Sequence, residues 1–365
     1  MIAALKDFTD RFFGRGEAAI TVPPFDGTLK PNQLLEEAAV VCDLDAPEDL
    51  ATDGASVWIA DGHRILRLEG GTPAEVATLD APITALAALP GGGFAVALGG
   101  RAVRIVGGTH DGRTWDAANG RAFNAINALS ITPEGKLLAT DGSQSRSYAQ
   151  WSHDLMELGR SGRLIELTPA NGGAREIATG LSYAFGACAT ADGVWVSESW
   201  RHRVVSFNGG KAGTAVLDRL PAYPSRLTPA TGGGYWLTAF IARTQLVEFI
   251  LREPGYRKRM MAEIDPRHWV APALGASTTF LEPMQGAHIK TMGILKPWAP
   301  PRSYGLVMRL TPQGLVRYSL HSRIDGQNHG VVAAVDCGGA LFVLSKGRRR
   351  LLRLDIADIE RSLQA

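Results

Sequence analysis

Short runs of alternating apolar and polar residues recur along the chain, each directly after a glycine-containing turn. Such alternation, rich in β-branched and aromatic residues, is typical of strands. Six runs follow such turns: VWIAD (57–61), FAVAL (94–98), LLATD (137–141), VWVSE (194–198), YWLTA (235–239) and LFVLS (341–345). A second strand-like segment follows each run: RILRL (64–68), AVRIV (102–106), RLIEL (163–167), RVVSF (203–207), LVMRL (306–310) and RLLRL (350–354). The pattern predicts six copies of one β unit.

Six units of this kind predict an all-β fold, a six-bladed β-propeller whose four-stranded blades surround a central channel. The last unit has no fourth strand after Leu354, whereas AAVVCDL (38–44) resembles the fourth strands EVATL (75–79) and REIAT (175–179). We therefore expect residues 38–44 to complete the blade formed by residues 331–354. Closing the ring in this way would leave no exposed sheet edge.

We expect the propeller to span residues 38–356, preceded by an N-terminal helix and extended arm at 1–37 and followed by a C-terminal tail at 357–365. Two intervals between glycine turns are much longer than the rest and predict insertions at about 142–160 and 243–304. The second has a helical composition that Pro254-Gly255 interrupts. Long insertions in compact domains commonly form lids or binding loops, so we expect both over one mouth of the channel.

Composition narrows the function classes. The chain is 45% hydrophobic and 20% charged, as in globular proteins, and its net charge of +2 argues against a nucleic-acid partner. No segment approaches the ~20 continuous apolar residues of a membrane span, and the N-terminus lacks the pattern of a signal peptide. Cys42, Cys188 and Cys337 share no metal-ligand spacing. We expect buried free thiols and a cytoplasmic location.

Several segments resemble the strictosidine synthase-like proteins, which are relatives of the gluconolactonase and paraoxonase propellers. The resemblance covers most of residues 45–355, and SESWRHRVVSF (197–207) is its most specific part. The other matching segments are NALSITPEGKLLATDGS (127–143), WSHDLMELGRSGRLIELTP (151–169), YAFGACATADGVWVSE (183–198), LPAYPSRLTPATGGGYWLTAF (220–240) and HGVVAAVDCGGALFVLSKG (329–347). The resemblance implies a six-bladed propeller and implies function less strictly, because one fold carries many activities.

In the lactonase and esterase relatives, a calcium ion in the channel is held by carboxylate and Asn side chains from several blades. The resemblance carries two of these positions over, to Glu48 in APEDLA and Asn127 in INALSI. The third, an Asn in the family, is Phe185 here, and the Asp-Asn of the fourth is Ser225-Arg226. Because Ca²⁺ requires about 6–8 oxygen ligands, the substitutions argue against a calcium site. We expect no cofactor, with Glu48 and Asn127 as residual positions of the family's metal set.

Arg226 suggests a substitute for the ion. It could pair with Glu48 and only seal the channel, or it could bind a carboxylate-bearing ligand in bidentate fashion; both interpretations remain open. The catalytic Glu of strictosidine synthase itself falls near Val332, and no Glu occurs between 328 and 340. This difference argues against the Pictet–Spengler condensation of strictosidine synthase.

The remaining candidates rest on position alone. His329 begins the last inner strand and could act as a general base at the channel mouth, or it could only cap a turn. Tyr148, Trp151 and Tyr223 could wall an aromatic pocket or could simply pack beneath the insertions.

Three further polar residues are expected to be structural. His153 and Asp154 diverge on a helix, so we expect a surface His and a capping Asp. His202 is expected to point outward.

Two classes of function follow from these residues. The first is an enzyme that hydrolyses an ester or lactone of a small organic substrate at the channel mouth. Glu48 or His329 would move protons and Arg226 would stabilise negative charge, while Asn127, Phe185, Tyr223, Ser225, Tyr148 and Trp151 would contact the substrate. The second is a protein without catalysis, either a binder of a small acidic metabolite or a scaffold for another protein. The sequence leaves the oligomeric state open.

Overall fold

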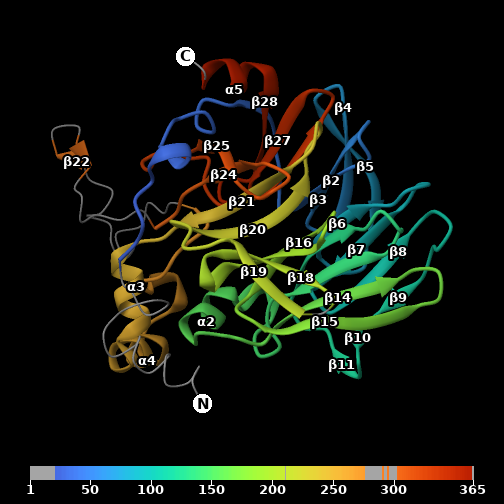
Figure 1. Ribbon diagram of the computed structural model, residues 1–365, viewed down its shortest axis with the longest axis horizontal. Helices are drawn as coiled ribbons and strands as arrows, with labels where there is room; N and C mark the ends of the chain where they lie inside the picture. The colour runs from blue at the N-terminus through green and yellow to red at the C-terminus, as the bar shows by residue number, and fades with distance from the viewer. Residues whose placement is uncertain (1–20, 210, 276–289, 292–293, 296–301, 364–365) are drawn as a thin grey trace.

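Six four-stranded antiparallel sheets surround a common axis in the described part of the chain, so the fold is the expected six-bladed β-propeller (Figure 1). The computed structural model describes residues 21–209, 211–275, 290–291, 294–295 and 302–363. The expected N-terminal helix falls in residues 1–20, outside the described residues.

The blades follow one another along the chain, and in the first five the innermost strand comes first. Blade one consists of β2 (Pro47–Thr52), β3 (Val57–Asp61), β4 (Arg64–Glu69) and β5 (Thr72–Thr78). Blade two consists of β6 (Ile83–Ala88), β7 (Phe94–Leu98), β8 (Ala102–Val106) and β9 (Thr114–Trp115). Blade three consists of β12 (Ile126–Ile131), β13 (Leu137–Asp141), β14 (Gly162–Thr168) and β15 (Gly173–Leu181).

Blade four consists of β16 (Ala184–Thr190), β17 (Gly193–Glu198), β18 (Arg203–Asn208) and β19 (Lys211–Leu217). Blade five consists of β20 (Ala222–Pro229), β21 (Tyr235–Ala242), β24 (Leu306–Leu310) and β25 (Val316–His321). Blade six consists of β26 (Val331–Cys337), β27 (Ala340–Ser345), β28 (Arg350–Asp355) and β1 (Ala39–Asp43). Two small ribbons lie outside the blades: β10 (Ala117–Ala118) with β11 (Arg121–Ala122), and β22 (Lys290–Thr291) with β23 (Ile294–Leu295).

The ring is closed by its two ends, as the sequence predicts. Strand β1 pairs antiparallel with β28, with Ala39 opposite Arg353 and Asp43 opposite Arg350. The last blade therefore takes three strands from the C-terminal part of the chain and one from the N-terminal part.

Glycine turns connect the first two strands of each blade for a steric reason. Gly234 adopts a φ of +77°, and a Cβ at this position would lie 2.1 Å from the carbonyl oxygen of Leu310 in the neighbouring strand. Only a residue without a side chain allows this left-handed conformation and this close approach. The glycine signal in the sequence thus marks where each blade turns back on itself.

Apolar side chains from neighbouring blades fill the space between them. Ile65 of blade one packs with Val96 of blade two, and Leu164 of blade three packs with Val196 of blade four; all four are fully buried. The core is thus a ring of interfaces between blades, which leaves the axis for more polar groups.

The two predicted insertions contribute helices to one side of the ring (Figure 1). The first forms η3 (Tyr148–Gln150) and α2 (Trp151–Met156), and the second forms α3 (Gln245–Arg252), α4 (Pro254–Glu263) and η5 (Pro266–His268). Helix α3 ends before Pro254, the first residue of α4, as the Pro-Gly interruption predicts. Buried side chains of α2, α3 and α4 share one apolar cluster with Tyr183 and Phe240.

The terminal segments pack on the last two blades. In the N-terminal arm, η2 (Gly27–Leu29) precedes Asn32, which donates to the carbonyl oxygen of Ser319, and Leu35 is fully buried. The segment expected as a C-terminal tail carries helix α5 (Ile356–Ser362), which buries Ile359. Within the described ranges, no helix combines the length and apolar character that crossing a membrane requires.

The three cysteines are free thiols, but only one of them is buried. Cys188 is buried, whereas Cys42 in β1 and Cys337 in β26, the outermost and innermost strands of blade six, are partly exposed. The expectation of three buried thiols was therefore wrong for two of them.

Candidate functional site

The innermost strands share an irregularity next to the axis. In five of the six, the second residue has no partner in the ladder with the neighbouring strand, because the register shifts around it. These residues are Glu48 in β2, Thr84 in β6, Asn127 in β12, Phe185 in β16 and Val332 in β26. In β20 the irregular stretch contains Ser225 and Arg226. Such bulges release backbone groups from the ladder and re-aim side chains, so the strands present both to the channel.

Arg226 uses the carbonyl groups that these bulges release. Its Nη1 donates to the carbonyl oxygens of Glu48 (3.0 Å) and Val332 (3.3 Å), and its Nη2 donates to those of Thr84 (2.9 Å) and Asn127 (2.6 Å). The guanidinium also lies 5.3 Å from the centre of the Phe185 ring. One buried side chain from blade five thereby contacts the inner strands of all the other blades.

The carboxylate partner of Arg226 is Asp49 and not the side chain of Glu48, as one interpretation of the sequence had it. Arg226 Nε lies 3.1 Å from Asp49 Oδ1, and both side chains are buried. Asp49 also accepts hydrogen bonds from the amides of Leu50 and Leu86. Burial raises the pKa of Asp49 to about 6, although Arg226 and these amides act to lower it.

The residues around Arg226 do not fit a calcium ion. The carbonyl oxygens that could serve as ligands point at a guanidinium, and an aromatic ring, Phe185, occupies the next position around the axis. Nowhere in the described part of the chain do three or more His, Cys, Asp or Glu side chains come together in a way that could hold a metal ion. The guanidinium of Arg226 thus occupies the position in which the family resemblance would place the calcium ion.

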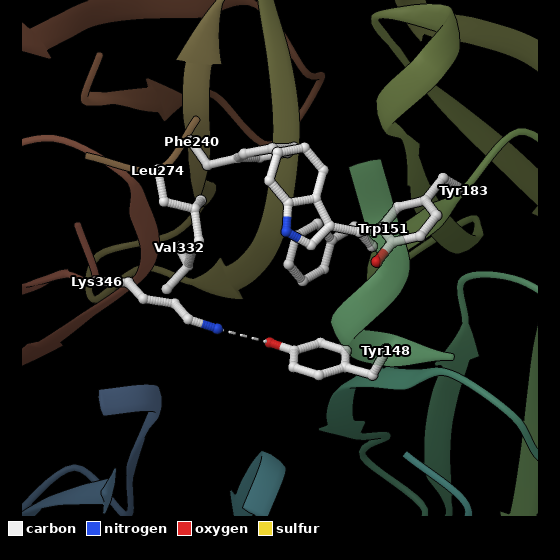
Figure 2. Close-up of a pocket in the computed structure, with 8 residues that line it drawn as sticks. Tyr148, Trp151, Tyr183, Phe240, Leu274, Val332 and Lys346 are labelled. Atoms are coloured by element: carbon white, nitrogen blue, oxygen red, sulfur yellow. Dashed lines mark hydrogen bonds between the residues drawn. The ribbon is translucent and has the colours of Figure 1, made fainter. Parts of the chain in front are cut away.

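A small, partly open pocket lies beside this layer (Figure 2). Its walls are mostly aromatic and aliphatic, and its lining residues are Tyr148, Trp151, Tyr183, Phe185, Phe240, Leu274, Val332 and Lys346. Residues from both insertions take part, because Tyr148 and Trp151 belong to the first and Leu274 to the second. A largely apolar cavity with few polar groups is the usual form of a small-molecule site.

The polar groups of the pocket form one compact cluster. Glu48 Oε2 accepts a hydrogen bond from the hydroxyl of Tyr148 (2.5 Å) and lies 2.6 Å from Lys346 Nζ. Lys346 Nζ is also 3.2 Å from the hydroxyl oxygen of Tyr148, the contact that Figure 2 marks. The side chains of Lys346 and Glu48 stay 21% and 18% exposed, so a ligand can reach them. Burial and the charge of Glu48 raise the pKa of Tyr148 well above its ordinary value, which keeps its hydroxyl protonated.

A buried carboxylate supports the aromatic wall. Asp154 accepts hydrogen bonds from Ser143 Oγ (2.6 Å) and Trp200 Nε1 (2.8 Å), and the Trp200 ring stacks on Tyr183 with 4.4 Å between ring centres. Burial raises the pKa of Asp154. The sequence interpretation of Asp154 as a helix cap was wrong, because its side chain points to the wall instead of the helix end. His153 likewise is not a free surface residue, since its ring lies against Trp269.

Of the nine candidates, Tyr148, Trp151 and Phe185 line the pocket, and Glu48 contacts it through Tyr148 and Lys346. The others lie deeper. Asn127 donates to the carbonyl oxygen of Ala184 and accepts from Thr140, so its amide joins two blades. The hydroxyl of Ser225 is hydrogen-bonded to Thr238.

Three expectations about orientation need correction. Tyr223 does not line the pocket: it is fully buried behind Phe240, a lining residue, and against the ring of His202. His202 does not point outward, because its Nε2 lies 3.0 Å from Glu248 of α3, and burial lowers its pKa well below the ordinary value. His329 is fully buried, with Nδ1 bonded to Ser303 Oγ and Nε2 near the carbonyl oxygen of Arg323, so it does not face the channel mouth.

Sequence reasoning missed five lining residues: Tyr183, Phe240, Leu274, Val332 and Lys346. A signal existed for Lys346, which follows the second strand of blade six at the end where the inner strand begins. From this end of the blade its side chain reaches Glu48 and Tyr148.

The comparisons with known proteins agree with this architecture. No model of a known protein family matches the chain. In sequence it is similar to adipocyte plasma membrane-associated protein of Salmo salar (25% identity over 93% of this chain and 83% of the relative). It is also similar to strictosidine synthase-like 6 of Arabidopsis thaliana (27% identity over 39% of each chain). The resemblance to strictosidine synthase-like proteins is therefore confirmed.

Solved structures support the same fold. A gluconolactonase of Xanthomonas campestris superposes with a TM-score of 0.55 at 13% identity, covering 87% of this chain and 88% of its own. Regucalcin of Agrobacterium tumefaciens, a calcium-binding protein, gives a TM-score of 0.51 at 11% identity over 87% and 92% of the two chains. At these identities the likeness concerns the fold.

Proposed function

We propose that this propeller, similar to strictosidine synthase-like proteins, hydrolyses an ester or lactone of a small organic molecule at the channel mouth without calcium. The observation that carries the proposal is the cluster of Glu48, Tyr148 and Lys346 at the rim of an otherwise apolar pocket. The fold shared with a gluconolactonase supports it by analogy.

The cluster offers the groups that such a reaction needs. Lys346 Nζ and the Tyr148 hydroxyl are 3.2 Å apart, so both can donate to one substrate oxygen, the carbonyl oxygen that becomes negative when water attacks. Both now donate to Oε2 of Glu48, a carboxylate oxygen, and this arrangement supports the proposed role. Glu48, once its donors turn to the substrate, accepts a proton from the attacking water.

Of the two roles that the sequence left open for Arg226, the proposal takes the structural one, with Asp49 in place of Glu48 as the carboxylate partner. Its Nη groups donate to four carbonyl oxygens and its Nε faces Asp49, so its polar atoms already have partners in the inner strands around the channel. The substrate meets Lys346 instead, while Arg226 holds the bulged strand that carries Glu48.

Hydrolysis of a panel of aryl esters and aromatic lactones, with and without EDTA, tests the proposal. We expect EDTA to leave the rate unchanged, and Glu48→Gln and Lys346→Met each to lower kcat/KM by about 10²-fold or more. Matched controls exist in the surface pair Lys136–Glu166, 3.1 Å apart. Lys136→Met and Glu166→Gln should keep full activity, and a rate that disappears with EDTA would overturn the proposal.

The second candidate is a binding protein for small carboxylates, favoured by the same two donors directed at one carboxylate oxygen. Isothermal titration with an aromatic carboxylate separates the two functions. Binding that depends on Lys346, with no turnover of any ester, supports the binder. A scaffold, the third alternative, would be insensitive to Glu48→Gln and Lys346→Met in both assays.

A further inference from the structure

Lys346 occupies an unusual place for a lysine. It lines an aromatic pocket, and its main chain is fixed there because its amide donates to the carbonyl oxygen of Gly330 (3.0 Å). The next residue is Gly347, where a Cβ would lie 2.1 Å from the carbonyl oxygen of Leu274. The glycine lets the segment with Leu274 approach closely, and this segment adds an apolar wall beside the amine. Among the described residues, no other lysine lines this pocket.

We propose that Lys346 is a nucleophile that forms an imine with small aromatic aldehydes, an activity beyond the proposed hydrolysis and independent of it. Imine formation by a lysine needs an acceptor for the ammonium proton, a donor for the carbonyl oxygen and an environment poor in water. Glu48 Oε2, 2.6 Å from Lys346 Nζ, is the proton acceptor. The Tyr148 hydroxyl, whose oxygen accepts from the same Nζ at 3.2 Å, is the group that donates to the aldehyde oxygen, and the aromatic walls limit water.

The proton transfers balance within these three side chains. The Lys346 ammonium gives one proton to Glu48, and the Nζ lone pair forms a bond to the aldehyde carbon while the carbonyl π electrons move to oxygen. Tyr148 gives its proton to that oxygen and regains one from nitrogen, which yields a neutral carbinolamine. Glu48 then returns its proton to the carbinolamine hydroxyl, the C–O bond breaks, and water leaves as the C=N bond forms. The products are a protonated imine, one water and the original carboxylate.

The walls define the class of aldehyde. Trp151, Phe185 and Phe240 present ring faces and edges, with the Phe185 and Phe240 ring centres 5.6 Å apart. Rings of this kind favour stacked and edge-to-face contacts with another aromatic ring. We therefore expect aromatic aldehydes such as benzaldehyde and indole-3-carbaldehyde to be preferred over saturated aldehydes.

Reductive trapping tests the inference on the intact protein. Benzaldehyde and indole-3-carbaldehyde are each added with sodium cyanoborohydride, and peptide mass spectrometry measures the labelling rate of every lysine. We expect Lys346 to be labelled about tenfold faster than exposed lysines such as Lys136, because the pocket holds the aldehyde beside the amine. A saturated control, hexanal, should show no such preference.

Variants make the result decisive. Glu48→Gln removes the proton acceptor and Tyr148→Phe removes the donor, so both should lower labelling at Lys346 to the rate of Lys136. Lys136→Ala is the matched control and should leave labelling at Lys346 unchanged. The inference would be overturned if the labelling rates of the lysines followed only their solvent exposure. It would also be overturned if Lys346 were labelled faster in Glu48→Gln than in the parent protein.

The outcome is separable from that of the proposed hydrolysis. Lys346→Arg keeps the positive charge that would stabilise an oxyanion but cannot form an imine. Trapping at Lys346 in a protein that hydrolyses no ester would support the imine and refute the hydrolase. Ester hydrolysis without preferential trapping at Lys346 would support the hydrolase and refute the imine.

Discussion

Arg226 and Asp49 form a buried ion pair between the fifth and the first blade, with Nε 3.1 Å from Oδ1. The same guanidinium donates to four carbonyl oxygens that the inner-strand bulges release from their ladders. Replacing it leaves a buried carboxylate and buried carbonyl groups without a partner. We expect Arg226→Met to lower the free energy of unfolding by about 3–5 kcal/mol, measured by urea denaturation.

Two further variants check this interpretation. Arg104→Met removes an arginine from an exposed pair with Asp80 and should change the unfolding free energy far less. Adding Asp49→Asn to Arg226→Met should recover part of the loss, because it removes the unpaired charge. An Arg226→Met variant as stable as the parent would show that the carbonyl groups find other partners.

Calcium should not stabilise this propeller, because the axial position is filled by a guanidinium and an aromatic ring. We expect the same Tm in EDTA and in millimolar calcium chloride. Regucalcin of Agrobacterium tumefaciens, a calcium-binding protein, is the positive control. The triple variant Phe185→Asn, Ser225→Asp, Arg226→Asn restores the residues that the family resemblance expects, and its Tm should rise with calcium. A calcium-dependent Tm in the parent protein would contradict our account of the axis.

Acid should destabilise the protein through His321. Burial lowers the pKa of His321 to about 4, whereas a histidine in the unfolded chain titrates near 6.5. Between these values the unfolded state binds more protons, so stability falls as the pH decreases from about 6.5 to about 4. The full loss is roughly 3 kcal/mol. His321→Gln should lose that part of the pH dependence, as urea denaturation at about pH 7 and about pH 4.5 would show.

Asp49 works in the opposite direction over nearly the same range. Its pKa of about 6 in the folded state lies above the value near 3.9 of an unfolded aspartate, so its protonation favours the fold as the pH falls. The parent protein alone therefore shows the sum of two opposed effects, and the comparison with His321→Gln isolates one. Identical pH profiles for the two proteins would rule out the role given to His321.

Asp154 should hold the aromatic wall in place. Asp154→Ala leaves Ser143 Oγ and Trp200 Nε1 without their acceptor, at a cost of about 1–3 kcal/mol for each buried group. Because Trp200 stacks on Tyr183, ligand affinity should fall as well, measured by titration calorimetry. Asp154→Asn retains an acceptor for Trp200 and should bind nearly as well as the parent. Equal affinity in Asp154→Ala would show that the wall does not depend on this carboxylate.

The blades could be predicted from the sequence because their signals are local. A glycine with positive φ, such as Gly234, and alternating strands on either side belong to one short segment. The closure of the ring was also predictable, since the last unit lacks a strand that residues 38–44 supply. These features depend on neighbours in sequence, which a linear pattern records.

The site depended on contacts that a linear pattern does not record. A bulge at Glu48 changes which way the strand's side chains point, so Glu48 faces Lys346 while Asp49 meets Arg226. His329 lies just before the inner strand β26 instead of beginning it, and Ser303 binds its ring within the core. Lys346 resembled an ordinary turn lysine because its partners, Glu48 and Tyr148, come from distant parts of the chain.

The pairing of β1 with β28 has a consequence for biosynthesis. Strand β1 is synthesised before the five intervening blades and β28 after them, so the backbone of β1 lacks its sheet partner until β28 has been made. The final blade can assemble only after translation has passed residue 355. A chain truncated within β28 would lose the strand that pairs with β1. Its ring would stay open, with unpaired sheet edges that can associate with other chains.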